Sequence, residues 1–169
     1  MRSGLDLYLV RHAVAHDRDP NRWPDDGERP LTPEGEKRFR RVAKGLIWLV
    51  PEVDLVLSSP FVRAWQTAEI MAGQGWPAPT PQPDLEPDYP LHRTLAVLRE
   101  RDGAGSIALV GHRPHVHELS SYLLTGEPKR VQTQIKKGGA LCIKFGGVPE
   151  PGSGTLAWLL TPKVLRGLA

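Results

Sequence analysis

The stretch Leu9-Val10-Arg11-His12 decides the fold class, because its pattern returns later in the chain as Leu109-Val110-Gly111-His112. Each apolar run is typical of a buried strand, and each ends on a histidine just before a polar turn. In an open α/β sheet, ligands bind in the crevice beyond the carboxyl ends of parallel strands. We therefore expect the two histidines to face one another across a small anion.

Length and composition indicate an ordinary globular protein. The 169 residues are enough to bury one hydrophobic core, so we expect a single domain over residues 1–169. The net charge of +3 comes from scattered Arg and Lys, without the run of like charges that marks a nucleic-acid-binding arm. The longest apolar stretches are far shorter than a membrane span. We expect a cytoplasmic protein with neither a nucleic-acid partner nor a membrane partner.

A single cysteine, Cys142, leaves no intramolecular disulfide and no cysteine-based metal site. It falls within the strand-like run 140–145, so we expect a buried thiol without a chemical role.

Strand and helix patterns alternate along most of the chain, as in βαβ units around a parallel sheet. Strands are expected over 7–10, 54–57 and 107–110. Helices are expected to begin at Thr32-Pro33, at Ser59-Pro60, at Leu91 and at Pro114. The Pro-rich stretch 75–90 is expected to hold a short strand and an acidic loop. The polar loop 16–29 is long enough to be functional, and we expect it to border the site.

The pattern changes after Gly139, where apolar residues alternate with others in two runs separated by a Gly/Pro turn. This alternation indicates a terminal β-hairpin. The predicted fold is a single three-layer α/β/α domain. Its central sheet is mostly parallel, helices cover both faces, and the antiparallel C-terminal hairpin lies at the sheet edge.

Two arginines accompany the histidines. Arg11 precedes His12, and Arg63 falls in the first turn of the helix that follows Ser59-Pro60. Guanidinium groups bind phosphate oxygens in a fork and stabilise the charge that develops during phosphoryl transfer. They also disfavour a further positive charge, which keeps a neighbouring histidine neutral and able to attack phosphorus. His112 would add a hydrogen bond from the opposite side.

Four motifs in this order resemble the histidine phosphatase (phosphoglycerate-mutase-like) superfamily over residues 7–124. They are Leu9-Val10-Arg11-His12-Ala13, the stretch 29–35 (RPLTPEG), the stretch 58–68 (SSPFVRAWQTA) and Val110-Gly111-His112. The small size resembles the short SixA-like phosphohistidine phosphatases. The resemblance implies that His12 is the nucleophile, that Arg11 and Arg63 bind the phosphate, and that His112 is the second histidine of the pocket.

The chain departs from the common family pattern at two positions. Ala13 stands where many members have Gly, and Arg113 stands where many have Asn. Neither change removes a catalytic group. Larger relatives supply a general acid after the third strand, and here Asp84, Glu86 and Asp88 are the candidates. We favour Glu86.

A zinc site at His112, His115 and His117 is the alternative for the second histidine turn. If the chain becomes helical at Pro114, His115 and His117 project about 200° apart and cannot share an ion. We therefore expect neither a metal nor a cofactor.

The sequence thus predicts a metal-independent phosphatase that works through a phosphohistidine intermediate on His12. The expected substrate is phosphohistidine on a protein, such as a histidine-phosphotransfer domain, because a fold without a helical insertion leaves the pocket open to a bulky substrate. The alternatives are a phosphatase of small sugar or nucleotide phosphates and a non-catalytic module that binds phosphorylated partners. The presence of both histidines and both arginines argues against the module.

Overall fold

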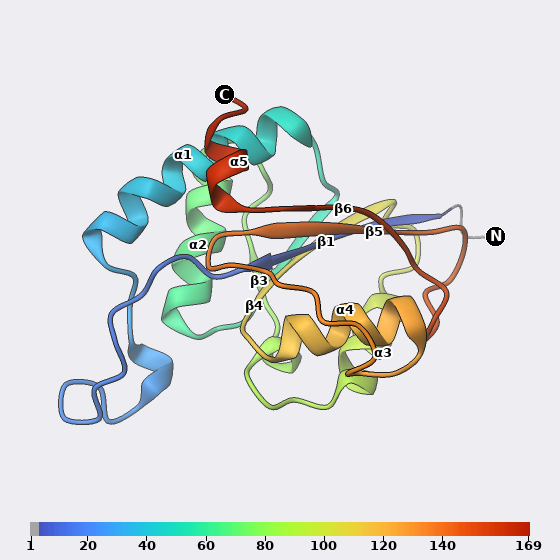
Figure 1. The fold of residues 1–169 in the computed structure, drawn as a ribbon, viewed down its shortest axis with the longest axis horizontal. Helices are drawn as coiled ribbons and strands as arrows, with labels where there is room; N and C mark the ends of the chain where they lie inside the picture. The colour runs from blue at the N-terminus through green and yellow to red at the C-terminus, as the bar shows by residue number, and fades with distance from the viewer. Residues whose placement is uncertain (1–3) are drawn as a thin grey trace.

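A six-stranded sheet forms the centre of the computed structural model, which describes residues 4–169 (Figure 1). Its strands are β1 (Leu5–Arg11), β2 (Leu55–Ser58), β3 (Thr80–Pro81), β4 (Ser106–Gly111), β5 (Ala140–Phe145) and β6 (Thr155–Leu160), in the order β3-β2-β4-β1-β5-β6. The pairs from β3 to β1 are parallel, whereas β5 pairs antiparallel with both β1 and β6. The predicted mostly parallel sheet with an antiparallel C-terminal hairpin at its edge is confirmed.

Helices cover both faces of this sheet (Figure 1). On one face lie α1 (Pro33–Leu49), α2 (Val62–Gly73) and α5 (Pro162–Arg166), and on the other lie α3 (Leu91–Glu100) and α4 (His115–Thr125). Side chains of a strand alternate between the two faces. In β1, Tyr8 and Val10 join the core beneath α1 and α2, whereas Leu7 and Leu9 join the core beneath α3 and α4. The three-layer prediction is therefore confirmed.

The start of α1 is fixed against the segment that follows β1. Thr32 caps the helix by accepting a hydrogen bond from the Gly35 N–H at 2.9 Å. A Cβ atom on Gly35 would overlap the carbonyl oxygen of Val14, so only glycine allows this close approach. Ala15 and Leu31 form an isolated antiparallel bridge beside it. These contacts bring the first turn of α1 close to the carboxyl end of β1.

Three details differ from the sequence-based expectations. In the Pro-rich stretch 75–90, the strand is limited to Thr80–Pro81, and a 3-10 helix, η2 (Pro83–Leu85), stands where the acidic loop was expected. Leu85 is fully buried, and its burial holds this turn against the core. The short helix α5 was not predicted at all. The helix predicted to begin at Ser59-Pro60 begins at Val62 instead, because Phe61, whose backbone is not helical, occupies the N-cap position.

No helix within residues 4–169 is long and apolar enough to cross a membrane.

Candidate active site

The two histidines meet at the carboxyl ends of neighbouring strands. Arg11 and Gly111 are register partners at the ends of β1 and β4, and the His12 N–H donates to the Gly111 carbonyl at 3.0 Å. The chain then turns, and the ring centroids of His12 and His112 lie 5.3 Å apart. Both side chains are buried. The structure therefore brings together the two histidines that the repeated sequence pattern pointed to.

The backbone and one threonine hold the His12 ring in a single tautomer. His12 Nδ1 lies 2.7 Å from the Ala13 carbonyl oxygen, which can only accept, so Nδ1 carries the proton. The Ala13 N–H donates to Thr67 Oγ1 at 3.0 Å, and Thr67 Oγ1 donates to the Arg63 carbonyl at 2.7 Å. In the neutral ring, Nε2 is then left with a free lone pair. Thr67, missed in the sequence analysis, links the His12 turn to α2.

Burial and nearby cations keep both histidines neutral. Burial lowers the pKa of His12 to about 3, the positive charges of Arg63 and Arg11 act in the same direction, and the hydrogen bond to Ala13 opposes them. Burial is the largest cause that lowers the pKa of His112 to about 2, and the charges of His12 and Arg63 also act to lower it. At neutral pH, His12 can therefore act as a nucleophile.

Arg63 reaches the site from the first turn of α2, as predicted, and is buried. Its guanidinium NH1 donates to the Asp26 carbonyl at 2.8 Å, and NH2 pairs with Asp26 Oδ2 at 3.2 Å. Hydrogen bonding from Arg29 and the charge of Arg63 lower the pKa of Asp26, so this carboxylate is ionised. Asp26 begins the 3-10 helix η1 (Asp26–Glu28) in the polar loop 16–29. The loop thus borders the site, although the sequence did not single out Asp26.

Ser59 has a role in the site rather than at the start of a helix. Its hydroxyl oxygen accepts from the Phe61 N–H at 3.2 Å and lies 2.8 Å from His112 Nε2. The helix α2 starts at Val62, and Phe61 at its N-cap position makes no side-chain capping hydrogen bond. The Phe61 ring meets the His112 ring edge-on at 5.3 Å, and the Arg63 guanidinium lies 5.2 Å from its centroid. Ser59 and Phe61 therefore fix the orientation of His112.

Arg11 is held from a distant part of the chain. Its NH1 donates to the Ile135 carbonyl at 3.1 Å, and the Ile135 N–H donates to His117 Nε2 at 3.2 Å. His115 Nε2 instead lies 3.0 Å from Thr94 Oγ1 on α3, so the two rings engage different segments. Within residues 4–169, no three His, Cys, Asp or Glu side chains are grouped to hold a metal ion.

The three acid candidates lie on or just after η2. Asp84 is engaged by Gln82 Nε2 at 3.0 Å and by Arg93 at 3.4 Å. Glu86 directly follows Leu85, whose carbonyl oxygen lies near the end of β4, 3.6 Å from where a Cβ on Gly111 would stand. Asp88 is exposed. In the described part of the chain, no hydrogen bond or ion pair joins the Glu86 carboxylate to either histidine.

Cys142 is buried in β5, as expected, and burial raises the pKa of its thiol to about 11.

Comparisons with known proteins agree with this geometry. The family model of the histidine phosphatase superfamily (branch 1) matches residues 7–86. An uncharacterised protein of Picosynechococcus sp. is 35% identical over 145 residues, which cover 84% of this chain and 86% of that protein. The phosphohistidine phosphatase SixA of Escherichia coli is 31% identical over 167 residues, which cover 96% of this chain and 97% of SixA.

A solved structure is also similar along the whole chain. The protein histidine phosphatase SixA complexed with tungstate superposes with a TM-score of 0.81 at 27% identity, covering 95% of this chain and 99% of that one. These similarities support phosphatase activity, which is a hydrolase reaction. The chain therefore belongs to the histidine phosphatase superfamily, in its SixA-like branch.

Proposed function

We propose that this chain is a metal-independent phosphatase that forms a phosphohistidine intermediate on His12 and acts on phosphohistidine in proteins. One observation carries the proposal: a neutral His12 keeps Nε2 unprotonated, faces His112 across 5.3 Å, and lies within the fields of Arg63 and Arg11. A nucleophile with a lone pair, surrounded by cations, suits attack on a phosphoryl group.

The reaction has two steps. In the first, His12 Nε2 forms a bond to phosphorus while the bond from phosphorus to the substrate nitrogen breaks, and the substrate leaves as a neutral imidazole whose other ring nitrogen has taken a proton from solvent. In the second, water attacks the phosphorus on His12 and loses a proton to solvent while the bond from phosphorus to Nε2 breaks, so inorganic phosphate leaves and the free histidine is restored. The Nδ1–H bond to the Ala13 carbonyl holds the ring in one orientation through both steps.

Cationic side chains supply the electrostatic stabilisation in this proposal. Arg63 has Nε without a hydrogen-bond partner among the described residues, and Arg11 has the same unpaired atom. Their guanidinium groups would bind the equatorial phosphoryl oxygens. His112 would add a hydrogen bond, with Ser59 holding its ring. No metal is required when these groups neutralise the transferred charge.

The substrate preference follows from the acid candidates. An ester oxygen leaves poorly unless a side chain protonates it, whereas the imidazole of phosphohistidine is protonated on its own ring. Glu86 is the proposed acid, yet within residues 4–169 its carboxylate forms no hydrogen bond or ion pair with either histidine, and the Asp84 carboxylate is engaged by Gln82 and Arg93. A site whose acid is not positioned to protonate the leaving group should hydrolyse a phosphoramidate faster than a phosphate ester. The names of the two SixA relatives, a phosphohistidine phosphatase and a protein histidine phosphatase, support the same choice.

A substrate panel tests the proposal. We expect a higher kcat/KM for a phosphohistidine protein or peptide than for sugar and nucleotide monophosphates. EDTA should leave the activity on each substrate unchanged. The Glu86→Gln variant should lose little activity on phosphohistidine and more on esters. His12→Gln is the control for background hydrolysis.

Other outcomes would contradict separate parts of the proposal. A higher kcat/KM for small esters would show that the chain is a phosphatase of small sugar or nucleotide phosphates. Loss of activity in EDTA, restored by zinc or magnesium, would overturn the metal-independent mechanism. Binding of phosphopeptides without turnover would make the chain a phospho-binding module.

A further inference from the structure

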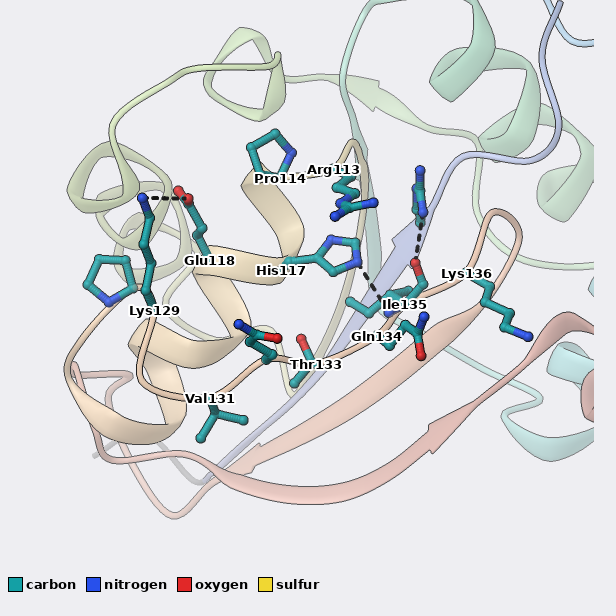
Figure 2. Close-up of a pocket in the computed structure, with 13 residues that line it drawn as sticks. Arg113, Pro114, His117, Glu118, Lys129, Val131, Thr133, Gln134, Ile135 and Lys136 are labelled. Carbon is teal, nitrogen blue, oxygen red and sulfur yellow. Dashed lines mark hydrogen bonds and ion pairs between the residues drawn. The ribbon is translucent and has the colours of Figure 1, made fainter.

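A cavity lies beside Arg11 of the candidate active site. It has a volume of about 590 Å³ and lies between the start of α4 and the segment 128–136 (Figure 2). Arg113 and His117 line it from the start of α4, and Gln134, Ile135 and Lys136 line it from the segment 128–136, where Ile135 contacts His117. Pockets of this size take molecules much larger than a single phosphate ion. The space therefore suits several residues of an extended peptide.

The cavity is strongly cationic. Its lining includes Arg11, Arg113, Lys129 and Lys136, with Glu118 as the one carboxylate among the described residues that line it. Glu118 lies 3.9 Å from Lys129, and Figure 2 shows this pair at the end away from Arg113. Of the residues that the structure describes, none that lines the cavity near Arg11, Arg113 and Lys136 therefore carries a carboxylate.

The positive charges at this end are not neutralised by the protein itself. Within residues 4–169, Arg113 and Lys136 form no ion pair and no side-chain hydrogen bond. Arg11 is half-buried, and its one side-chain hydrogen bond goes to a neutral carbonyl. Arg11 and Arg113 line the same cavity, and burial and then the positive charge of Arg113 lower the pKa of Arg11, because like charges repel. An anion between them would relieve this repulsion.

The cavity meets the histidine pair at Arg11, which lines the cavity and whose positive charge also acts on His12. Arg11 precedes His12 and Arg113 follows His112, and the two histidine rings are 5.3 Å apart. A group bound in the cavity would therefore belong to the same substrate as the phosphoryl group bound at His12. Gln132 and Gln134 add amide groups to the lining, which suit hydrogen bonding to a peptide backbone.

We propose that the cavity bounded by Arg11, Arg113 and Lys136 binds acidic side chains of the protein segment that carries the phosphorylated histidine. This inference rests on the proposed function and names the partner chemistry: a phosphohistidine flanked by Asp or Glu. Arg113 is the residue that determines this specificity, because it is exposed, unpaired and directly follows His112.

The test compares two phosphohistidine peptides that differ only in their flanking residues, which are Glu in one and Gln in the other. The measured quantity is the ratio of kcat/KM for the acidic peptide to that for the neutral peptide. We expect a ratio of about fivefold for each carboxylate engaged, decreasing as salt is added. Arg113→Gln should bring the ratio toward one, and Arg113→Glu should bring it below one.

The control is Arg41→Gln, which removes the same charge from an exposed position on α1, on the opposite face of the sheet. It should leave the ratio at the wild-type value. A wild-type ratio of one, with both peptides hydrolysed, would overturn the inference while the proposed function stands. A high ratio that Arg113→Gln does not reduce would also overturn it. Failure to hydrolyse either peptide would instead contradict the proposed function.

Discussion

Replacement of Thr67 by valine tests how the fold orients the nucleophile. Thr67 is fully buried, and its hydroxyl accepts from the Ala13 N–H at 3.0 Å while it donates to the Arg63 carbonyl at 2.7 Å. Valine has nearly the same shape but cannot accept, so the buried Ala13 N–H loses its partner. An unsatisfied buried donor costs about 1–3 kcal/mol of the free energy of unfolding. For a domain of this size, the Tm should fall by about 2–12 °C.

Catalysis should suffer beyond this loss of stability. The Ala13 carbonyl accepts the hydrogen bond from His12 Nδ1. If the Ala13 backbone moves more freely, the His12 ring moves with it, and the position of Nε2 becomes less well defined. A nucleophile misplaced by about 1 Å costs on the order of 100-fold in rate. We expect Thr67→Val to lower kcat about 10–100-fold at a temperature where the variant remains folded, with a smaller change in KM. The assay is steady-state hydrolysis of a phosphohistidine peptide, with circular dichroism to confirm folding.

Thr67→Ser is the matched control, because it keeps the hydroxyl and removes only a methyl group. It should lose about 1 kcal/mol of stability and keep most of its kcat. The reasoning is refuted if Thr67→Val retains full kcat, or if Thr67→Ser loses as much kcat as Thr67→Val.

Three further predictions concern charge. The native pKa values of His12 and His112 are lowered to about 3 and 2, so the unfolded chain binds more protons between these values and about 6.5. Stability should be full above pH 6.5 and fall by about 1 kcal/mol per pH unit for each histidine as the pH decreases; urea unfolding at pH 7, 6 and 5 measures this, and equal stabilities would contradict it. Arg63→Lys should have a lower kcat/KM than the wild type and a higher one than Arg63→Ala. The ammonium group of lysine keeps the positive charge, but it cannot reproduce the forked contact of a guanidinium group with two phosphate oxygens. Asp26→Asn should raise KM by loosening Arg63, and an unchanged KM would show that Asp26 does not orient it.

Local sequence patterns were sufficient to predict the parts of the site that depend on strand ends. Two apolar runs that end on histidine place both rings together if the runs are neighbouring parallel strands, and Arg11 and Gly111 are indeed register partners. Thr32 caps its helix with the predicted geometry. The Thr161-Pro162 pair repeats this signal, and Thr161 accepts from the Val164 N–H. The helix it caps has five residues, which is too short to show an apolar period.

Contacts between distant segments could not be predicted in this way. The Asp26 carbonyl that accepts from Arg63 is 37 positions away, and the Ile135 carbonyl that accepts from Arg11 is 124 positions away. Nothing in the local sequence of either acceptor indicates its partner. The position of Ser59 before a proline suggested a helix start, whereas its hydroxyl is used by His112. Tertiary packing decided these roles.

The most direct test of covalent catalysis by His12 is to trap the phosphorylated enzyme. Labelled phosphohistidine substrate is mixed rapidly with the protein, the reaction is stopped without acid, and the modified residue is mapped by mass spectrometry and ³¹P NMR. Because Nδ1 is bonded to the Ala13 carbonyl, we predict a phosphoryl group on Nε2 of His12, absent from His12→Gln. Label on His112 or on any other residue would contradict covalent catalysis by His12. Steady turnover with no labelled enzyme, together with full activity in His12→Gln, would contradict it as well.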